Sequence, residues 1–279
     1  MEKILIAIDA VNANPHSLDF ACYLGRLTNS KITGVFLENL IEDEKLVLQE
    51  THGARYVSWE ADKGSQAFQN KLGTIEKNLR LFKDACDKRG VRYSVHRDSG
   101  DPAREIIRES RYADLLITDA ETSFNRKFDG VPTEFVKDVL KDAECPVIIA
   151  PESFDGIDEI VFTYNASKSS LFAIKQFCYL FPELDVKKIT VLQIEDDDDS
   201  TEPEKEKFKE WISGHYSSIG FETLKGDPET ELFAHLLGKQ KVFIVMGAYG
   251  RSNLSQLFKH SRADLLIKTV TQAIFIAHS

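Results

Sequence analysis

The sequence has no long hydrophobic run, few cysteines and fewer basic than acidic side chains. A membrane-spanning helix needs about 18 or more consecutive apolar residues, and no run of that length is present. Since the chain also opens directly on a strand-like segment, we expect a cytoplasmic protein that makes no membrane contact. The four cysteines form no C-x-x-C pair and are interpreted as reduced core residues. A formal net charge of −10 argues against broad binding to nucleic acid.

Patterns typical of catalysis and of metal binding are also missing. There is no G-x-S-x-G nucleophile turn, and no Ser-Gly-Gly phosphate loop follows the first expected strand. The histidines show no metal-ligand spacing. The acidic run Asp196–Asp199 lacks the spaced oxygen ligands and the turn glycine of a calcium loop. We therefore predict no metal site and no catalytic residue, and at most a slow ATPase.

What the sequence does contain is an internal repeat. Short segments recur in the same order in both halves, beginning with Ile4–Asp9 and Ile160–Asn165. The other pairs are Cys22–Leu24 with Cys178–Leu180, Lys31–Thr33 with Lys188–Thr190, Gly100–Pro102 with Gly226–Pro228, and Pro146–Ala150 with Ile274–Ala277. A repeat this long indicates two domains. We predict domains at residues 1–152 and 157–279, with an insertion near 42–70 that forms either a helical excursion or a flap over the first domain.

Within each half, short apolar runs alternate with amphipathic segments of helix length, the pattern of parallel strands joined by crossover helices. The strands expected in the first half lie near residues 3–8, 31–37, 92–96, 115–118 and 146–150. The fold class is therefore α/β, with two tandem doubly wound five-stranded parallel sheets. The closing strands Val147–Ala150 and Ile274–Ala277 are apolar. Their pairing would hide both sheet edges and form an intramolecular pseudo-dimer, and a homodimer of the whole chain stays open.

One loop of the second half has glycines that suit a phosphate. The apolar run 242–246 leads directly into Gly247 and Gly250, and glycines allow backbone N–H groups to approach a ligand closely. Ligands of such sheets bind at the carboxyl ends of the strands. The first strand of this half ends at Asn165, so Asn165 and the glycine loop should face one crevice.

These residues resemble the universal stress protein family in its tandem form, over nearly the whole chain. The family pattern is G-x-x-G after the fourth strand, then nine residues, then Gly and Ser or Thr, with an aspartate ending the first strand. His260 replaces the later glycine and Asn165 the aspartate. Members that keep the motif bind ATP, so the resemblance implies ATP or AMP in the second domain, with or without Mg, and an adenine nucleotide alpha-hydrolase-like fold. The nucleotide-binding residues that it implies are Asn165, Ala166, Gly247, Gly250, Arg251, His260 and Ser261.

The first half departs further from the same pattern. It keeps Asp9 but has Asp119 and Thr122 at the first glycine positions, and Thr133 at the later pair. The carboxylates of Asp119 and Glu121 would repel phosphate. We predict that this degenerate site, made of Asp9, Asp119, Thr122 and Thr133, is closed or refilled and that the first domain is a non-binding partner.

Three functions therefore remain open. The first is a stress-response protein whose second domain binds an adenine nucleotide. The second is an interaction or scaffold module that binds no nucleotide and acts through protein partners that the sequence does not identify. The third is a slow ATPase, for which the sequence shows no general base.

Overall fold

The structure is a computed structural model, and it describes residues 1–39, 44–51, 54–61, 65–125, 130–195, 202–226, 228–247 and 272–277. Within this part of the chain ten strands form one continuous sheet. From one edge to the joint, the first half (residues 1–152) contributes β5 (Tyr93–Gly100), β2 (Lys31–Asn39), β1 (Lys3–Asp9), β6 (Leu115–Thr118) and β7 (Val147–Ile149). The second half (residues 157–279) continues with β12 (Ala273–Ala277), β11 (Val242–Gly247), β8 (Glu159–Tyr164), β9 (Lys188–Glu195) and β10 (Ile219–Lys225).

The two halves have the same strand order and meet at their closing strands. Within each half, the strand pairs of the ten-stranded sheet are all parallel, whereas β7 and β12 pair antiparallel, with Ile148 opposite Phe275. This arrangement confirms the predicted fold class, because two doubly wound five-stranded sheets join through the two apolar closing strands. Pairing them removes two edges that would otherwise expose backbone N–H and C=O groups.

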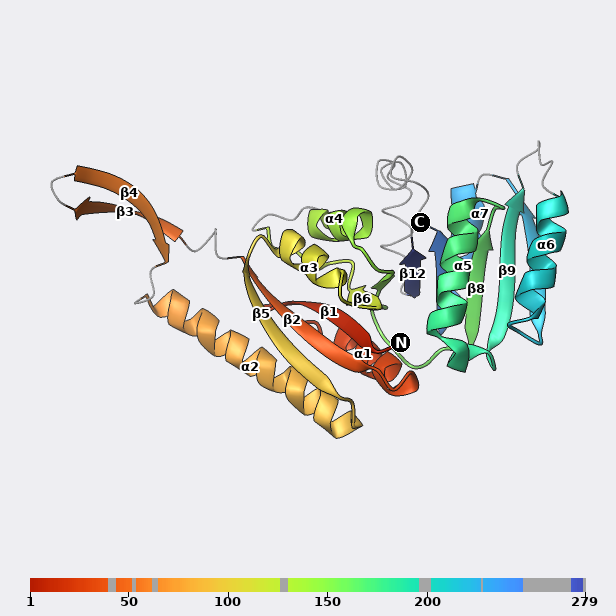
Figure 1. Ribbon diagram of the computed structural model, residues 1–279, viewed down its shortest axis with the longest axis horizontal. Helices are drawn as coiled ribbons and strands as arrows, with labels where there is room; N and C mark the ends of the chain where they lie inside the picture. The colour runs from red at the N-terminus through yellow and green to blue at the C-terminus, as the bar shows by residue number, and fades with distance from the viewer. Residues whose placement is uncertain are drawn as a thin grey trace.

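Helices cover both faces of the sheet (Figure 1). In the first half they are α1 (Pro15–Leu27), α2 (Gln66–Arg89), α3 (Pro102–Ser110) and α4 (Glu134–Asp142). In the second half they are α5 (Lys168–Leu180), the short 3₁₀ helix η2 (Pro182–Leu184), α6 (Glu202–Ser213) and α7 (Pro228–Leu236). Alternate residues of β1 enter different cores: Ile4 and Ile6 join the one that includes α1 and α2, and Leu5 joins the one that includes α3 and α4. Burial on both faces is typical of a parallel sheet.

Helix ends follow the local sequence signals. Asp101 is the N-cap of α3, and its carboxylate accepts hydrogen bonds from the N–H groups of Ala103 (3.1 Å) and Arg104 (3.4 Å). Pro102 occupies the first turn, where its missing N–H has no helical partner to lose. At the C-terminal end of α2, Gly90 has a left-handed φ of 64° and ends the helix.

The predicted insertion is a β-hairpin instead of a helical excursion. Strands β3 (Glu44–Thr51) and β4 (Ala54–Ala61) pair antiparallel and form a two-stranded sheet of their own. The hairpin extends away from the ten-stranded sheet beyond the start of α2, so it is not a flap over the first half (Figure 1). Residues 66–70 of the predicted insertion belong to α2.

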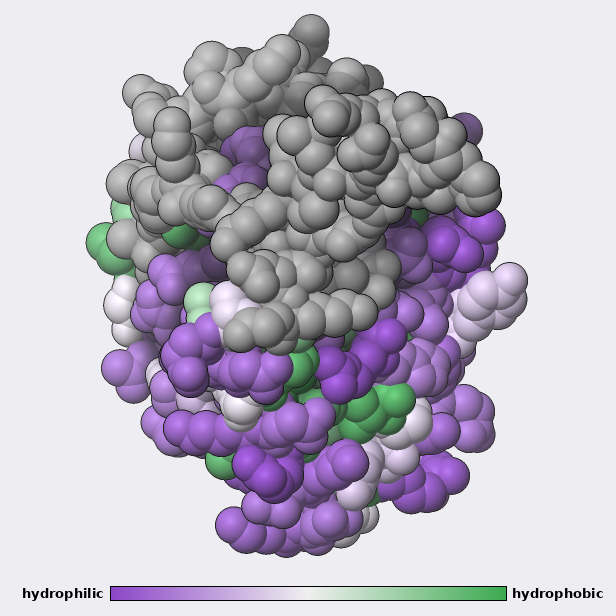
Figure 2. Space-filling view, turned by 90° about the vertical axis from the view of Figure 1, so that its left-hand side faces the viewer, coloured by the Kyte–Doolittle hydropathy of each residue, from purple (hydrophilic) through white to green (hydrophobic). Residues whose placement is uncertain are grey.

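The described residues on one face of the molecule are mainly polar (Figure 2). Hydrophilic residues predominate on the described part of the face viewed from the hairpin side, with small hydrophobic patches among them (Figure 2). No helix of the described residues is long and apolar enough to cross a membrane. Nor do these residues bring three histidine, cysteine or acidic side chains together in a way that could hold a metal ion.

Candidate functional site

The predicted site of the second half lies at the carboxyl end of β8, where the chain turns sharply into α5. Asn165 follows β8 directly and is exposed, and its side-chain oxygen accepts a hydrogen bond from the Ser167 N–H (3.3 Å). Ala166 has a left-handed φ of 57°. Ser167 is the N-cap of α5, and its hydroxyl accepts from the Ser170 N–H (3.1 Å). The turn therefore presents the Asn165 amide at the sheet edge, close to the positive end of the α5 dipole.

Gly247, at the end of β11, lies against the first turn of α5. A Cβ atom at this position would stand 2.5 Å from the carbonyl carbon of Ser169 and 2.6 Å from the nitrogen of Ser170. Only glycine allows the strand and the helix to approach this closely. The structure thus brings Gly247 and the Asn165 turn together at the carboxyl ends of the parallel strands. The other predicted residues, Gly250, Arg251, His260 and Ser261, lie outside the described residues.

An aromatic stack fills the space between the end of β8 and α6. Tyr164, the last residue of β8, is 5% exposed. Its ring stacks on Phe208 of α6 with centroids 4.0 Å apart and planes 11° from parallel, and its hydroxyl donates to the Glu204 carbonyl (3.5 Å). Burial raises the pKa of the Tyr164 phenol above its ordinary value. In the second half, the region beside Asn165 is therefore occupied by side chains of the protein.

In the first half, the predicted degenerate residues are held by hydrogen bonds of the protein itself. One carboxylate oxygen of Asp9 accepts from the N–H groups of Val11 (2.8 Å) and Asn12 (3.1 Å), and the other accepts from the Asn12 side-chain amide (2.9 Å). Asp119 accepts from the Glu121 N–H (3.0 Å) and from the Ser17 hydroxyl (3.4 Å), which joins the end of β6 to α1. Both carboxylates thus support their own turns.

The two threonines of this site close the loop between β6 and α4. Thr122 and Thr133 are buried, and the Thr133 hydroxyl donates to the Thr122 carbonyl. The same hydroxyl caps α4 by accepting from the Val136 N–H (3.3 Å), and the Thr133 N–H donates to the Ala120 carbonyl (3.2 Å). The positions where glycines would admit a phosphate therefore hold an internal hydrogen-bonded loop.

A pocket opens beside this loop, next to the site that the sequence predicts to be closed or refilled. It has a volume of about 350 Å³ and lies between α1, α2 and the carboxyl ends of β1 and β6. Ile8, Phe36 and Phe82 are among its apolar lining residues, and Asp9 and Asp119 are among its polar ones. A signal for it was present in the repeat, because the first half has Ile8 where the second half has the larger Tyr164.

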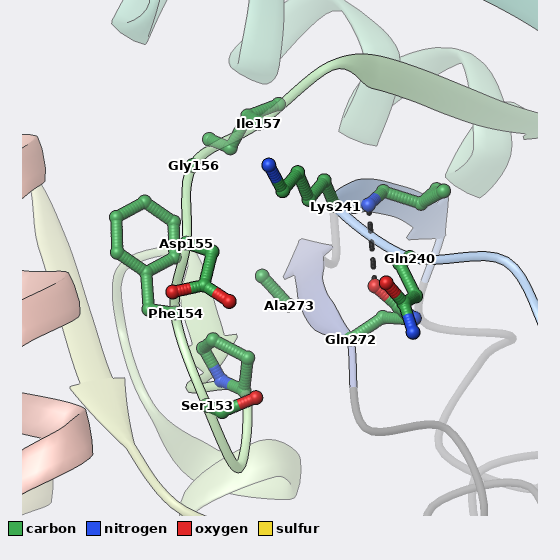
Figure 3. A pocket seen from close by; sticks show the side chains of 11 residues that line it. Ser153, Phe154, Asp155, Gly156, Ile157, Gln240, Lys241, Gln272 and Ala273 are labelled. Atoms are coloured by element: carbon green, nitrogen blue, oxygen red, sulfur yellow. Dashed lines mark hydrogen bonds between the residues drawn. The ribbon is translucent and has the colours of Figure 1, made fainter.

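A smaller pocket of about 150 Å³ lies at the amino ends of β11 and β12, by the segment that connects the halves (Figure 3). Ser153 to Ile157 line one side, and Gln240, Lys241 and Gln272 the other. Lys241 has a left-handed φ of 54°, and its carbonyl accepts from the Asp158 N–H (2.8 Å). The Gln272 side chain accepts from the Val242 N–H (3.2 Å) and donates to the Lys239 carbonyl. These contacts fasten the connection to the amino ends of β11 and β12, away from the Asn165 turn.

Comparison with known proteins shows similarity of fold without similarity of sequence. No protein-family model and no curated protein matches the chain. A universal stress protein from Archaeoglobus fulgidus has a similar structure, with a TM-score of 0.67 and 15% identity over 99% of this chain and 98% of its own. A protein of unknown function from Pseudomonas aeruginosa gives a TM-score of 0.58 and 12% identity, over 100% of this chain and 92% of its own.

A third structure, a universal stress protein family protein from Arabidopsis thaliana with AMP bound, covers 53% of this chain and 88% of its own, at 16% identity and a TM-score of 0.34. That score is too low for a comparison of individual residues, so the AMP is a property of the Arabidopsis protein alone. The two matches along the whole length agree with the strand order and the joint between the closing strands. The chain therefore has, over its whole length, the fold of a universal stress protein.

Proposed function

We propose that this protein is of the universal stress type and binds an adenine nucleotide, ATP or AMP, at the domain formed by residues 157–279. The first domain, residues 1–152, is the partner of the second domain and does not itself bind the nucleotide. One observation carries the proposal: Gly247 at the end of β11 and the Asn165 turn at the end of β8 lie together at the carboxyl ends of the strands. Gly247 packs against the first turn of α5, the helix that the Asn165 turn leads into. Ligands of doubly wound sheets bind at the carboxyl ends of the strands.

The chemistry of the described residues fits this ligand in part. The Asn165 amide is exposed and offers both an acceptor and two donors, as the edge of an adenine ring requires. The N-terminus of α5 favours negative charge nearby. Phosphate contacts are assigned, on the sequence pattern alone, to Gly250, Arg251, His260 and Ser261.

Mass spectrometry of the purified, denatured protein tests for a co-purified nucleotide, and calorimetric titration with ATP and AMP, with and without Mg²⁺, measures affinity. We expect Gly250→Val to weaken binding by about 1 to 3 kcal/mol, since a β-branched side chain restricts the turn and blocks close approach. The matched control is Gly73→Val on α2, where a Cβ meets no other atom within 4 Å. Unchanged affinity in a folded Gly250→Val variant would place the nucleotide elsewhere.

A second function, an interaction module without a nucleotide, is favoured by two packing observations. The close approach of β11 to α5 accounts for Gly247 without a ligand, and Tyr164 with Phe208 fills the space next to Asn165. This alternative predicts no co-purified nucleotide and no heat of binding with either ATP or AMP. Release of phosphate from ATP, measured on the same sample, tests the slow ATPase.

A further inference from the structure

The pocket of the first half has an apolar floor shaped by three elements. Ile8 of β1 lies opposite Phe36 of β2 in the sheet register. The ring of Phe82, from α2, meets Phe36 edge to face with centroids 5.8 Å apart. Leu18 of α1 and Ala85 of α2 also line the pocket. A cavity of about 150 Å³ with apolar walls is enough to bind benzene. At about 350 Å³, this pocket has room for a fused bicyclic ring and a short side chain.

The second half fills the corresponding place with a ring of its own. Tyr164 stands where the first half has Ile8, because each residue directly precedes the polar residue that follows or ends the strand. Phe208 of α6 corresponds to Phe82 of α2, because each of these helices precedes the edge strand of its half. Each ring also lies four residues before a fully buried side chain, which is Ile212 in α6 and Cys86 in α2.

Tyr164 and Phe208 stack at 4.0 Å. In the first half the neighbouring strand supplies a ring at Phe36, where the second half has Gln193, yet a pocket remains. The first half therefore leaves space where its repeat holds a flat ring.

Charges at the pocket disfavour an anion. Asp9, Asp19 and Asp119 line it, and no lysine or arginine is among its described lining residues. Arg89 forms an ion pair with Asp19, whereas the described hydrogen-bond partners of Asp9 and Asp119 include no basic side chain. Two carboxylates close to an apolar pocket attract a cation and repel phosphate, and the effect is larger where water is partly excluded.

We propose that this pocket binds a small bicyclic aromatic amine, with the ring on Ile8, Phe36 and Phe82 and the ammonium group at the Asp119 carboxylate. Aromatic ligands contribute large buried areas and stack or pack edge to face on phenylalanine rings. A few polar groups at the mouth of an apolar pocket are the usual source of orientation and specificity. The site is independent of the proposed nucleotide site, which lies in the other half of the chain.

The test is calorimetric titration of the full-length protein with three indoles that share one ring. Tryptamine is a cation at pH 7, tryptophol is neutral and indole-3-propionate is an anion. We expect tryptamine to bind about tenfold or more tightly than indole-3-propionate, a difference of about 1.4 kcal/mol, with tryptophol between them. Asp119→Asn should lower the affinity for tryptamine about three- to tenfold and leave the affinity for tryptophol unchanged. Asp185→Asn, an exposed carboxylate of the second half, is the matched charge control and should change neither.

Filling the pocket tests its position. Ile8→Tyr copies the side chain of the second half, and we expect it to reduce tryptamine affinity at least about tenfold. Ala85→Leu fills the pocket from α2 and serves if Ile8→Tyr fails to fold, as judged by circular dichroism and thermal midpoint. Saturating AMP should leave tryptamine binding unchanged. Equal affinity for the amine and the acid, no tryptamine binding at millimolar concentration, unchanged binding in a folded filling variant, or competition by AMP would each overturn the proposal.

Discussion

Asp98, on the edge strand β5, has a buried carboxylate oxygen, Oδ2, with no hydrogen-bond partner among the described residues. Burial, and then the negative charges of Glu109 and Glu105, raises the pKa of this carboxyl above its ordinary value. A carboxyl group whose pKa is raised by folding stabilises the fold only while it is protonated. At neutral pH, the ionised Asp98 therefore opposes folding.

We expect Asp98→Asn to raise the free energy of unfolding at pH 7 by up to about 1 kcal/mol, a small value because the group is only partly buried. The advantage should shrink as the pH falls through the raised pKa, and vanish below about pH 3.9, the usual value of an unfolded aspartate, since wild-type Asp98 is then protonated. Urea unfolding between pH 3.5 and 7 measures this, with exposed Asp155→Asn as the control. A constant difference across that range would contradict the prediction.

At the scale of elements, the contact between β11 and α5 shows how one residue sets a strand-to-helix distance. Gly247 closes the strand, and the backbone of Ser169 and Ser170 lies where its Cβ would be. Because backbone atoms cannot move away as a flexible side chain can, any larger residue must push the helix from the sheet.

We predict that Gly247→Ala lowers the free energy of unfolding by about 1 to 3 kcal/mol, the usual cost of overpacking. Gly73→Ala is the matched control: this glycine lies inside α2 with open space at its Cβ. The control should be stabilising by about 0.5 to 1 kcal/mol, since alanine favours the helix. Equal effects in chemical unfolding experiments would mean that the close approach does not restrict residue 247.

The hairpin β3–β4 is the element that sequence analysis placed but did not identify. Its two segments, EKLVLQET and ARYVSWEA, are rich in aliphatic, aromatic and β-branched residues, which favour strands. Several charged residues among them give the segment a mixed pattern, which the sequence alone leaves open to a helical excursion or a flap. Strand pairing across a short turn is a contact between segments, so the pattern of one segment alone is ambiguous.

On the scale of the whole molecule, the two halves share a core. One cluster of buried side chains contains Phe20 from α1 and Phe243 from β11, whose rings meet with centroids 6.0 Å apart. The connecting segment adds Phe154, which contacts Phe20 edge to face at 5.1 Å. Together with the β7–β12 pair, these contacts predict that the halves unfold as one cooperative unit.

Phe275 on β12 tests that cooperativity. Its ring is fully buried and meets Phe177 at 5.4 Å and Phe181 at 6.2 Å, and its backbone position is opposite Ile148 of the first half. Phe275→Ala should lower the free energy of unfolding by about 3 to 5 kcal/mol and move a single calorimetric transition. Exposed Phe221→Ala should change stability by about 0.5 kcal/mol or less. Two separated transitions in the wild-type protein would show that the halves unfold independently.

Local signals were enough to predict the strands of the first half and the repeat. Each of these depends on neighbours in the chain, because the spacing of apolar residues sets which face of an element is buried. The pairing of β7 with β12 was also predictable, because two apolar edges in one chain have few other ways to be covered.

The pocket of the first half and the filled space of the second could be decided only in three dimensions. A cavity is a difference between the volume enclosed by several elements and the volume of the side chains that they supply. The exchange of Ile8 for Tyr164 acquires its meaning only when α2 and β2, or α6 and β9, are in place around it. Strand and helix patterns specify which residues point inward, whereas the packing of residues distant in sequence determines whether any space is left over.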